Sequence, residues 1–217
     1  MLHTVLHTLG RATLAAGLSL AAAQAGAVTI TFNELTPGTT LANQYAASGV
    51  VFTPNAFSGV GSSTSGEPWA TNTHMTIVDS QGPDVGALGL PALASGNLLR
   101  SRPGWLGENG DASFLMRFST PISSFSADFI GVDEFADVTI WAYSGSTLLG
   151  TVSGTTTGQF TLTFAATSIT SVAVRPGNYF DWVAVDNINY TLVPEPGSYV
   201  LMGLGLAVLA LRRRQQG

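Results

Sequence analysis

Apolar and polar residues alternate with a period of two along the middle of this chain, and this pattern limits it to β-structure. Segments 114–118, 125–129, 138–143 and 160–164 each place apolar side chains at every second position. Because successive side chains of a strand point to opposite faces, each segment is expected to form a strand with one face on a core. No long segment between residues 28 and 193 has helical periodicity. The pattern therefore predicts an all-β body.

Shorter apolar segments predict the remaining strands, and turn-forming residues such as Ser144-Gly145-Ser146 separate them. Many short antiparallel strands joined by turns are typical of a β-sandwich or jelly roll, which is the fold class that we expect. Two segments rich in small and turn-forming residues, 54–74 and 80–111, are expected to be long loops. The remaining strands are expected at Val28–Glu34, Gly49–Thr53, Met75–Asp79, Thr147–Ser153, Ile169–Arg175 and Trp182–Leu192.

Both ends of the chain have the composition of targeting segments. Residues 1–27 combine Arg11, an apolar, helix-favouring run and the small-residue site Ala23-Gln24-Ala25, which is the pattern of a secretory signal peptide. An apolar stretch at 199–211 lies between Pro194-Glu195-Pro196 and Arg212-Arg213-Arg214. The sequence predicts a signal peptide at 1–27, a β-sandwich ectodomain at 28–192 and a tail at 193–217.

The apolar stretch of the tail is short for a membrane span. As a helix it would measure about 20 Å, whereas a bilayer core is ~30 Å thick. The three arginines after it are expected to stay on the cytoplasmic side, which leaves the body outside. Both ends therefore predict an exported body, with the C-terminal helix in the inner membrane before any processing.

The charge of the body excludes some classes of partner. Outside the two ends, four arginines and no lysine stand against twelve acidic residues, a net charge of −8. Nucleic-acid backbones are bound mainly through Lys and Arg, so we expect no nucleic-acid partner. The chain has no cysteine, so neither disulfides nor thiolate metal sites can hold it together.

The tail resembles the PEP-CTERM sorting signal in Pro194-Glu195-Pro196, the short apolar segment and the arginine cluster Arg212, Arg213 and Arg214. This resemblance implies recognition by an exosortase-type membrane protease in an exopolysaccharide-producing bacterium. The Pro-Glu-Pro would mark the processing region. The body would then be released or attached at the cell surface or in the extracellular matrix. A plain membrane anchor would share the topology and differ only in later processing.

The body is similar to β-sandwich domains of the carbohydrate-binding-module type. The similarity rests on Thr31-Phe32-Asn33-Glu34-Leu35, Gly49-Val50-Val51-Phe52 and, near the end, Val185-Asp186-Asn187-Ile188. In such domains the first and last strands pair, so the resemblance implies that Val28–Glu34 lies beside Trp182–Leu192.

Acidic residues are the main candidates for a bound ion, and calcium is the cation that carboxylate oxygens suit. One candidate site joins Asp128 to the acidic loop that follows it. The other, which the sandwich resemblance suggests, joins Glu34 to Asp186. Solvated acidic residues without any ion are the alternative for both. The full candidate set is Glu34, Asp128, Asp133, Glu134, Asp137 and Asp186.

Catalytic groups are few, whereas aromatic residues are well placed to bind a ligand. His74 is the only histidine of the body, and no G-x-S-x-G motif accompanies it. Trp69 and Trp105 lie in the two long loops and Tyr179 precedes the last strand, so these aromatics are candidates for stacking on a glycan. For Trp69 and Trp105 the alternative is packing over an open end of the sandwich. Trp141 and Trp182 are expected to pack in the core.

These observations predict a non-enzymatic surface or matrix protein that adheres to polysaccharide with the help of calcium. A purely structural, self-assembling matrix protein is one alternative. A secreted hydrolase that uses a pair of carboxylates is the other.

Overall fold

The computed structural model describes residues 26–54, 75–82, 94–100, 113–132, 138–154, 156–176 and 183–193, with helical residues at 203–205, 209 and 212–213. The chain divides into two compact units. One contains residues 25–193, and the other contains residues 1–24 and 194–217. In the second unit, no helix formed by described residues is long and apolar enough to cross a membrane.

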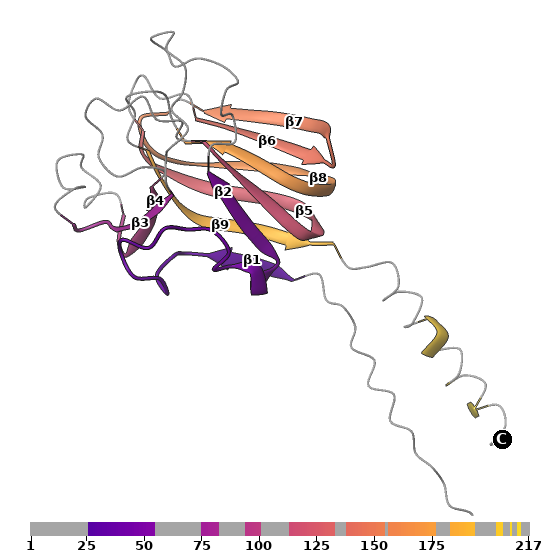
Figure 1. Ribbon diagram of the computed structural model, residues 1–217. Helices are drawn as coiled ribbons and strands as arrows, with labels where there is room; N and C mark the ends of the chain where they lie inside the picture. Colours follow the sequence, from indigo (N-terminus) through magenta and orange to yellow (C-terminus); the bar gives the residue numbers. More distant parts are fainter. Residues whose placement is uncertain are drawn as a thin grey trace, which may run out of the picture. The chain divides into compact units, whose positions relative to one another are not determined.

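In its described residues the body (residues 25–193) is an antiparallel β-structure with a short 3-10 helix (Figure 1). The strands pair in the order β3-β4-β9-β5-β8-β6-β7, with β1 beside β9 and β2 beside β5. The elements are β1 (Ala27–Ile30), η1 (Ala46–Ser48), β2 (Val50–Pro54), β3 (Thr76–Asp79), β4 (Asn97–Arg100), β5 (Phe114–Val132), β6 (Val138–Ser144), β7 (Thr147–Gly154), β8 (Gly158–Arg175) and β9 (Ala184–Leu192).

The strands form two layers, and the long strands β5 and β8 connect them because each runs through both layers. Their ladder is irregular between Arg117 and Ser124, where Pro121 lies in β5 and Ser168 in β8 has a positive φ of 60°. Such bulges bend strands and increase their twist. Before this bend, β5 pairs with β2, whereas after it β5 pairs with β9.

The first layer therefore contains β7, β6, the C-terminal half of β8, the N-terminal half of β5, and β2. The second layer contains the N-terminal half of β8, the C-terminal half of β5, β9, β4 and β3, with β1 on β9. The sequence indicates two strands in 114–129 and two in 160–175, whereas the structure has one bent strand in each region.

The core lies between the layers and uses the alternating positions that the sequence singles out. Phe114, Met116 and Phe118 of the first layer and Phe125 and Phe129 of the second are all buried. The ring centres of Phe118 in the first layer and Tyr190 in the second lie 5.1 Å apart, so this contact links the two layers. All described strands and described core residues belong to the body, so this unit has a core of its own.

Glycines let the layers approach closely at β7. A methyl group added at Gly150 would lie 2.7 Å from Cε2 of Phe164, and one added at Gly154 would lie 2.5 Å from Cε2 of Phe160. Real side chains do not tolerate such contacts. The two phenylalanines of β8 therefore fill the space that the absent side chains of β7 leave.

Three expectations from the sequence need correction. β1 ends at Ile30 rather than at Glu34, because Phe32 has a left-handed backbone with φ of 59° that leaves the extended conformation. Segment 80–111, expected to be a loop, contains strand β4. Trp141 does not pack in the core: it is half-buried on the outer face, with the guanidinium carbon of Arg175 at 5.4 Å from its ring centre.

The expected pairing of the first and last strands is confirmed. β1 runs antiparallel to β9, with Ala27 opposite Thr191 and Ile30 opposite Ile188. This pairing brings the segment that follows β1 next to Asp186 and Asn187 in β9 and so creates the wall of a pocket.

Candidate functional site

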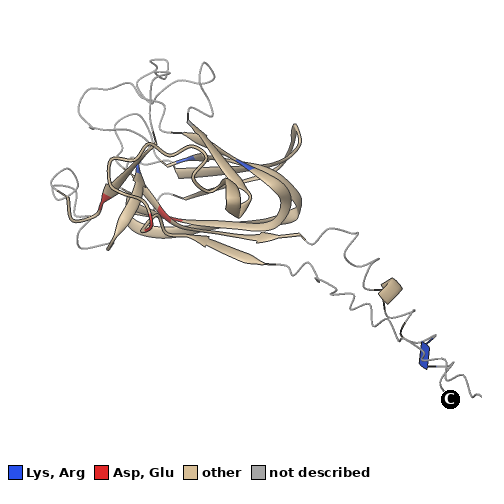
Figure 2. Cartoon of the chain, turned by 60° about the horizontal axis from the view of Figure 1, so that its bottom comes forward, with Lys and Arg blue, Asp and Glu red and all other residues tan. Residues whose placement is uncertain are grey.

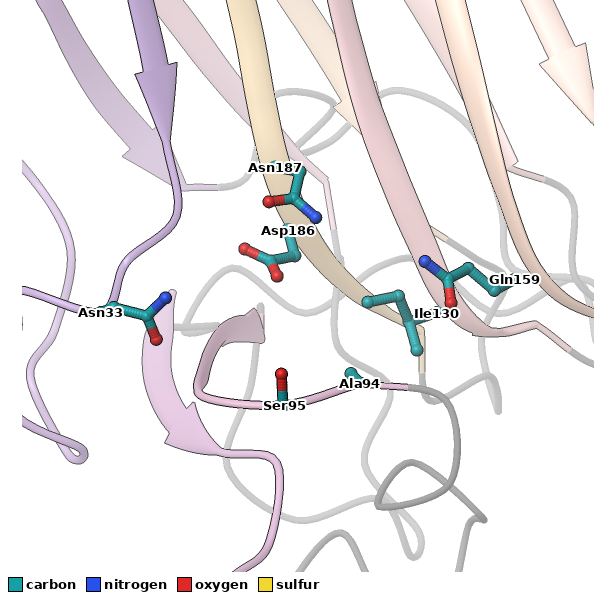
Figure 3. A pocket seen from close by; sticks show the side chains of 7 residues that line it. All are labelled: Asn33, Ala94, Ser95, Ile130, Gln159, Asp186 and Asn187. Carbon is teal, nitrogen blue, oxygen red and sulfur yellow. The ribbon is translucent and has the colours of Figure 1, made fainter.

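A polar pocket opens on the outer side of the second layer, near the start of β9 (Figure 3). Its volume is about 420 Å³. It lies where the segment after β1, the segment before β4, and strands β5, β8 and β9 meet. Its polar lining residues are Asn33, Ser95, Gln159, Asp186 and Asn187, and its apolar ones are Ala94 and Ile130.

The wall formed by Asn33 depends on a close contact with Gly96. The side-chain oxygen of Asn33 accepts the backbone N–H of Asn97 at 2.8 Å. Gly96 has φ of 83°, and a methyl group there would lie 2.2 Å from that oxygen. The amide of Asn97 in turn donates to the carbonyl oxygen of Leu35 at 2.6 Å. These contacts fix the segment after β1 against the start of β4 and so hold Asn33 at the pocket.

The floor of the pocket contains a bulge in β9. The ladder between β5 and β9 shifts between Ser126 and Asp128, and Asn187 there has a positive φ of 47°. Asparagine tolerates this left-handed conformation better than most residues. Its side-chain amide donates to Oδ2 of Asp128 at 2.9 Å, while the hydroxyl of Thr161 donates to Oδ1 of the same carboxylate.

Asp186 is the most unusual group at this site. The side chain is buried, and its Oδ1 has no hydrogen-bond partner among the described residues. Burial raises the pKa of Asp186 to about 6, the backbone N–H of Asn187 lowers it in part, and the charge of Asp128 raises it. A buried carboxylate oxygen without a partner is costly, so this position favours either a proton or a cation.

Glu34 lies close to the same group of side chains. Burial raises the pKa of Tyr45 above its ordinary value, and the carboxylates of Glu34 and Asp186 raise it further. The structure thus brings the two residues of the Glu34–Asp186 candidate site to the same tyrosine. Among the residues that the structure describes, no three acidic or histidine side chains gather closely enough to hold a metal ion by themselves.

Of the other candidate site residues, only Asp128, Arg212 and Arg213 lie among the described residues. Asp128 lies in β5 and pairs with Asp186 across the ladder. Asp133, Glu134 and Asp137 lie outside the described residues. The aromatic candidates Trp69, Trp105 and Tyr179 also lie outside them, as do His74 and the sorting residues Pro194, Glu195, Pro196 and Arg214; Arg212 and Arg213 are helical and exposed.

Sequence reasoning missed four of the residues at the pocket. Asn33 and Asn187 are adjacent to Glu34 and Asp186, so an asparagine beside each acidic candidate was a signal that could have been used. Ser95 and Gln159 have no such local signal, because only the packing of β4 and β8 brings them to the pocket.

Comparison with protein families identifies the tail. Residues 192–214 match the PEP-CTERM protein-sorting motif. The chain carries a PEP-CTERM sorting motif. This motif indicates an exported protein, and it begins at the last residue of β9, where the body ends. A comparison with curated protein sequences found no significant match.

Several solved structures are similar to the body in fold. The K2 cleaved adhesin domain of Lys-gingipain has a TM-score of 0.46 and 15% identity, covering 77% of this chain and 100% of that one. The K1 adhesin domain from Porphyromonas gingivalis W83 has a TM-score of 0.45 and 10% identity, covering 77% and 99%. TmCBM61, solved in complex with β-1,4-galactotriose, has a TM-score of 0.35 and 12% identity, covering 75% and 98%. At this similarity they carry no argument about a ligand of this chain.

Proposed function

We propose that this protein is an exported, non-enzymatic adhesion protein that binds polysaccharide at the cell surface or in the exopolysaccharide matrix. In this proposal an exosortase-type protease recognises the PEP-CTERM tail. The C-terminal helix holds the chain in the inner membrane until Pro194-Glu195-Pro196 is processed. The sorting motif supports export, and the polar pocket of the second layer supports binding.

The composition of the pocket carries the binding proposal. Ligand pockets are usually lined mainly by apolar side chains. Here the lining is dominated by three side-chain amides, one hydroxyl and one carboxylate. Side-chain amides carry both donors and an acceptor, which is what a ligand rich in hydroxyl groups requires. The oxygen of Asn33 and one donor of Asn187 already take part in hydrogen bonds within the protein. Gln159 and Ser95 are exposed and thus accessible to such a ligand.

Calcium fits the same region. Asp186 has a buried oxygen without a partner among the described residues, and the carboxylates of Glu34 and Asp186 both raise the pKa of Tyr45. A hard cation between Glu34 and Asp186 would satisfy that oxygen. Backbone carbonyls and water would have to complete the coordination. The cation would supply positive charge, and the two carboxylates would join the segment after β1 to β9. Asn33 would be held more firmly as a result.

The loop aromatics Trp69, Trp105 and Tyr179, which lie outside the described residues, remain part of this proposal as groups that stack on a glycan. A second calcium ion at Asp128, Asp133, Glu134 and Asp137 also remains proposed. At that site, both carboxylate oxygens of Asp128 already accept hydrogen bonds from Thr161 and Asn187. Asp128 would thus have to share its oxygens with the ion.

One observation favours a hydrolase as the second candidate. Asp128 and Asp186 face each other on neighbouring strands. Both oxygens of Asp128 accept hydrogen bonds, whereas Oδ1 of Asp186 has no partner among the described residues. Glycosidases use such a pair, with one carboxyl protonated and the other ionised. Hydrolysis of a bound glycan that ceases in both Asp128→Asn and Asp186→Asn would establish this alternative.

A glycan-binding screen on the body, residues 26–193, tests the proposal. The screen is run with calcium and again with a chelator. We expect binding to a polysaccharide that weakens in Gln159→Ala and Ser95→Ala and with chelator. Ser146→Ala, in the β6–β7 turn of the other layer, serves as the control and should bind as the unaltered body does. Absence of binding in both conditions would contradict adhesion. If the body then oligomerised with rising concentration, it would be a self-assembling matrix protein.

A further inference from the structure

A long segment of the body carries no charge. From Val138 to Val174 the sequence contains no Asp, Glu, Lys, Arg or His, and no proline interrupts it. The segment contains β6, β7 and all of β8 except Arg175. Figure 2 shows long stretches of strand without acidic or basic residues. The whole net charge of −8 of the body therefore lies outside this segment.

Within this segment, both layers of the sandwich end on the same side. β7 is the last strand in the pairing order and, among the described strands, pairs only with β6 (Figure 1). In the second layer, residues 158–165 of β8 pair with β5, whereas β6 pairs with residues 171–175 of β8. The close approach of Gly150 to Phe164 places β7 against residues 158–165 of β8. We call residues 147–154 and 158–165 the β7 side.

Side chains of the β7 side are accessible to solvent. Leu148 and Leu149 are 50% and 37% exposed, and no other large apolar side chain in the described part of the body is as exposed. Leu149 is the extra residue of a bulge, since Leu148 and Gly150 have consecutive partners in β6. This bulge leaves both leucines facing water, while the remainder of β7 pairs regularly with β6. Thr151 and Ser153 in this regular part are also exposed.

Other edges of the described sheet are covered or short. The backbone N–H of Gly38 donates to the carbonyl oxygen of Ile77 at 2.7 Å, so the segment around Gly38 covers β3. The backbone N–H of Phe52 donates to the carbonyl oxygen of Ala42 at 2.8 Å, which covers β2 in the same way. β1 has only four residues, whereas β7 has eight, and no described segment covers them. Proteins also protect strand edges with lysine or proline, and β7 has neither.

We propose that β7 pairs with β7 of a second copy of this chain, antiparallel and about a two-fold axis. An exposed strand edge offers unpaired backbone N–H and C=O groups, which another strand can satisfy. A two-fold axis lets the same edge serve both copies and closes the assembly at two. The exposed leucines of each copy would also lose contact with water, which favours association.

The faces of β7 limit how the two copies can pair. Thr151 and Ser153 lie opposite Trp141 and Thr139 of β6 and share their outward direction. A two-fold axis perpendicular to the sheet keeps outward residues outward in both copies. Thr151 therefore lies opposite Thr151 or Ser153 of the second copy, and such hydroxyl pairs stabilise neighbouring strands. In the second layer, the edge formed by residues 158–165 of β8 would lie beside its own copy.

Charge favours a second copy over other partners. Two bodies with a net charge of −8 repel each other, and this repulsion is weakest where the facing surfaces carry no charge. Pairing along β7 brings no like charges opposite each other, which would destabilise a sheet. A basic partner would instead be attracted to the acidic residues outside residues 138–174. The uncharged edge therefore suits a second copy of the same chain.

The pairing does not rest on the proposed binding of polysaccharide, although it would affect that binding. Gln159 lies both at the polar pocket and in the edge of β8. A dimer would carry two such pockets, one from each copy, and both could hold the same polymer. Linked sites of this kind bind a polymer more tightly than one site does.

Sedimentation equilibrium of the body, residues 26–193, tests the pairing. A chelator is present, so that calcium cannot bridge acidic residues of two copies. We expect a monomer–dimer equilibrium that rising salt strengthens, because salt screens the repulsion between the two bodies. Thr151→Lys adds a charge to the middle of β7 and should weaken dimerisation about tenfold or more.

Thr53→Lys is the matched control for Thr151→Lys. Thr53 is also exposed, and it lies in β2 at the opposite edge of the first layer. The two variants have the same net charge, so a general effect of charge on association would appear in both. Thr53→Lys should dimerise at least as well as the unaltered body.

Engineered cysteines locate the contact, because the chain has no cysteine of its own. A short thiol-reactive crosslinker should join copies of Thr151→Cys into covalent dimers, and copies of Thr53→Cys should stay separate. Leu148→Ser should weaken dimerisation without adding a charge. Circular dichroism shows whether each variant is folded.

Three results would overturn the inference: a body that stays monomeric at every concentration, dimerisation that Thr151→Lys leaves unchanged, or growth beyond the dimer. These are distinguishable from failure of the adhesion proposal. If a monomeric body binds a glycan through Gln159 and Ser95, adhesion stands and only the pairing is refuted. If the body dimerises through β7 and binds no glycan, the pairing stands and adhesion is refuted.

Discussion

Asp128 of β5 and Asp186 of β9 lie directly opposite each other in the antiparallel ladder, yet their carboxyl groups have different surroundings. Thr161 and Asn187 donate to the two oxygens of Asp128. Asp186 is buried with its Oδ1 unpartnered among the described residues, and burial is the main reason that its pKa is raised to about 6. The pair therefore favours one ionised and one protonated carboxyl, or a cation beside Asp186.

The raised pKa of Asp186 predicts a pH dependence of stability in the presence of a chelator. The unfolded chain loses this proton near its ordinary pKa of 3.8, whereas the folded chain keeps it up to about pH 6. Between these values the folded state binds more protons, so the free energy of unfolding falls as pH rises, by up to about 3 kcal/mol from this group. Well below pH 3.8 this carboxyl is protonated in both states, so it no longer makes the free energy of unfolding depend on pH.

Asp186→Asn removes the titrating group and should remove this decrease. Urea unfolding of both proteins at several values between pH 4 and 7 measures it. The difference between the variant and the unaltered body isolates Asp186 from the other carboxyl groups. Parallel stability curves for the two proteins would show that Asp186 has an ordinary pKa.

Calcium should raise the melting temperature of the body. A cation that binds only the folded state at 100 times its Kd stabilises it by about 2.7 kcal/mol, which corresponds to roughly 5–10 °C for a domain of this size. Glu34→Gln and Asp186→Asn should each abolish most of the increase. Asp79→Asn is the control, because within the described part of the chain the Asp79 carboxylate accepts the backbone N–H of Gln81, and an asparagine oxygen can do the same. An unchanged melting temperature would refute both calcium sites.

Asn187 has two roles that different substitutions separate. Its φ of 47° penalises most residues, and its amide donates to Asp128. Asn187→Gly keeps the backbone conformation and loses the hydrogen bond, whereas Asn187→Ala loses both. We expect the alanine variant to be about 1 kcal/mol less stable than the glycine variant in chemical unfolding. The opposite order would show that the bulge in β9 does not depend on its left-handed residue.

Gly150→Ala should destabilise the body by about 1–3 kcal/mol, because the added methyl group would lie 2.7 Å from the ring of Phe164. The exchange Phe164→Leu removes the ring. In its presence the same glycine substitution should cost clearly less, as a double-mutant cycle would measure. An identical cost in both backgrounds would place the strain elsewhere in β7.

The sorting motif predicts processing of the tail in a host that has an exosortase-type system. Replacing Pro194, Glu195 and Pro196 together by alanine should leave an uncut precursor in the membrane fraction, because the processing region would no longer be recognised. Immunoblots of cell fractions measure the size and location of the product. Ser198→Ala, which changes a neighbouring residue outside the Pro-Glu-Pro, is the control. Normal processing of the triple variant would contradict the role of this motif.

Much of the fold could be predicted from local sequence, because period-two alternation records which face of a strand is buried. Phe114 and Met116 in β5, and Ile140 and Ala142 in β6, are buried as their alternation indicates. Trp141 directly follows the buried Ile140, so the same alternation predicts that Trp141 points away from the core. The expectation that it packs in the core disregarded this pattern. The bends at Pro121 and Ser168 were not predictable in this way, since alternation does not reveal whether two strands are continuous.

The site was less predictable than the fold. Glu34 and Asp186 were paired from the expected contact of the first and last strands, and that contact is confirmed. Ser95 and Gln159 reach the pocket only through the packing of β4 and β8, neither of which has a local signature of a binding site. The opposition of Asp128 and Asp186 depends on the register of a ladder between residues far apart in the chain.

By itself, the sequence determined the all-β class, the core-facing positions and the PEP-CTERM tail, because each is encoded in neighbouring residues. Only the tertiary structure decided which strands join the two layers, where the pocket opens, and why Asp186 is buried beside Asp128. These features depend on pairing between distant segments, and burial and electric fields arise only once those segments have come together.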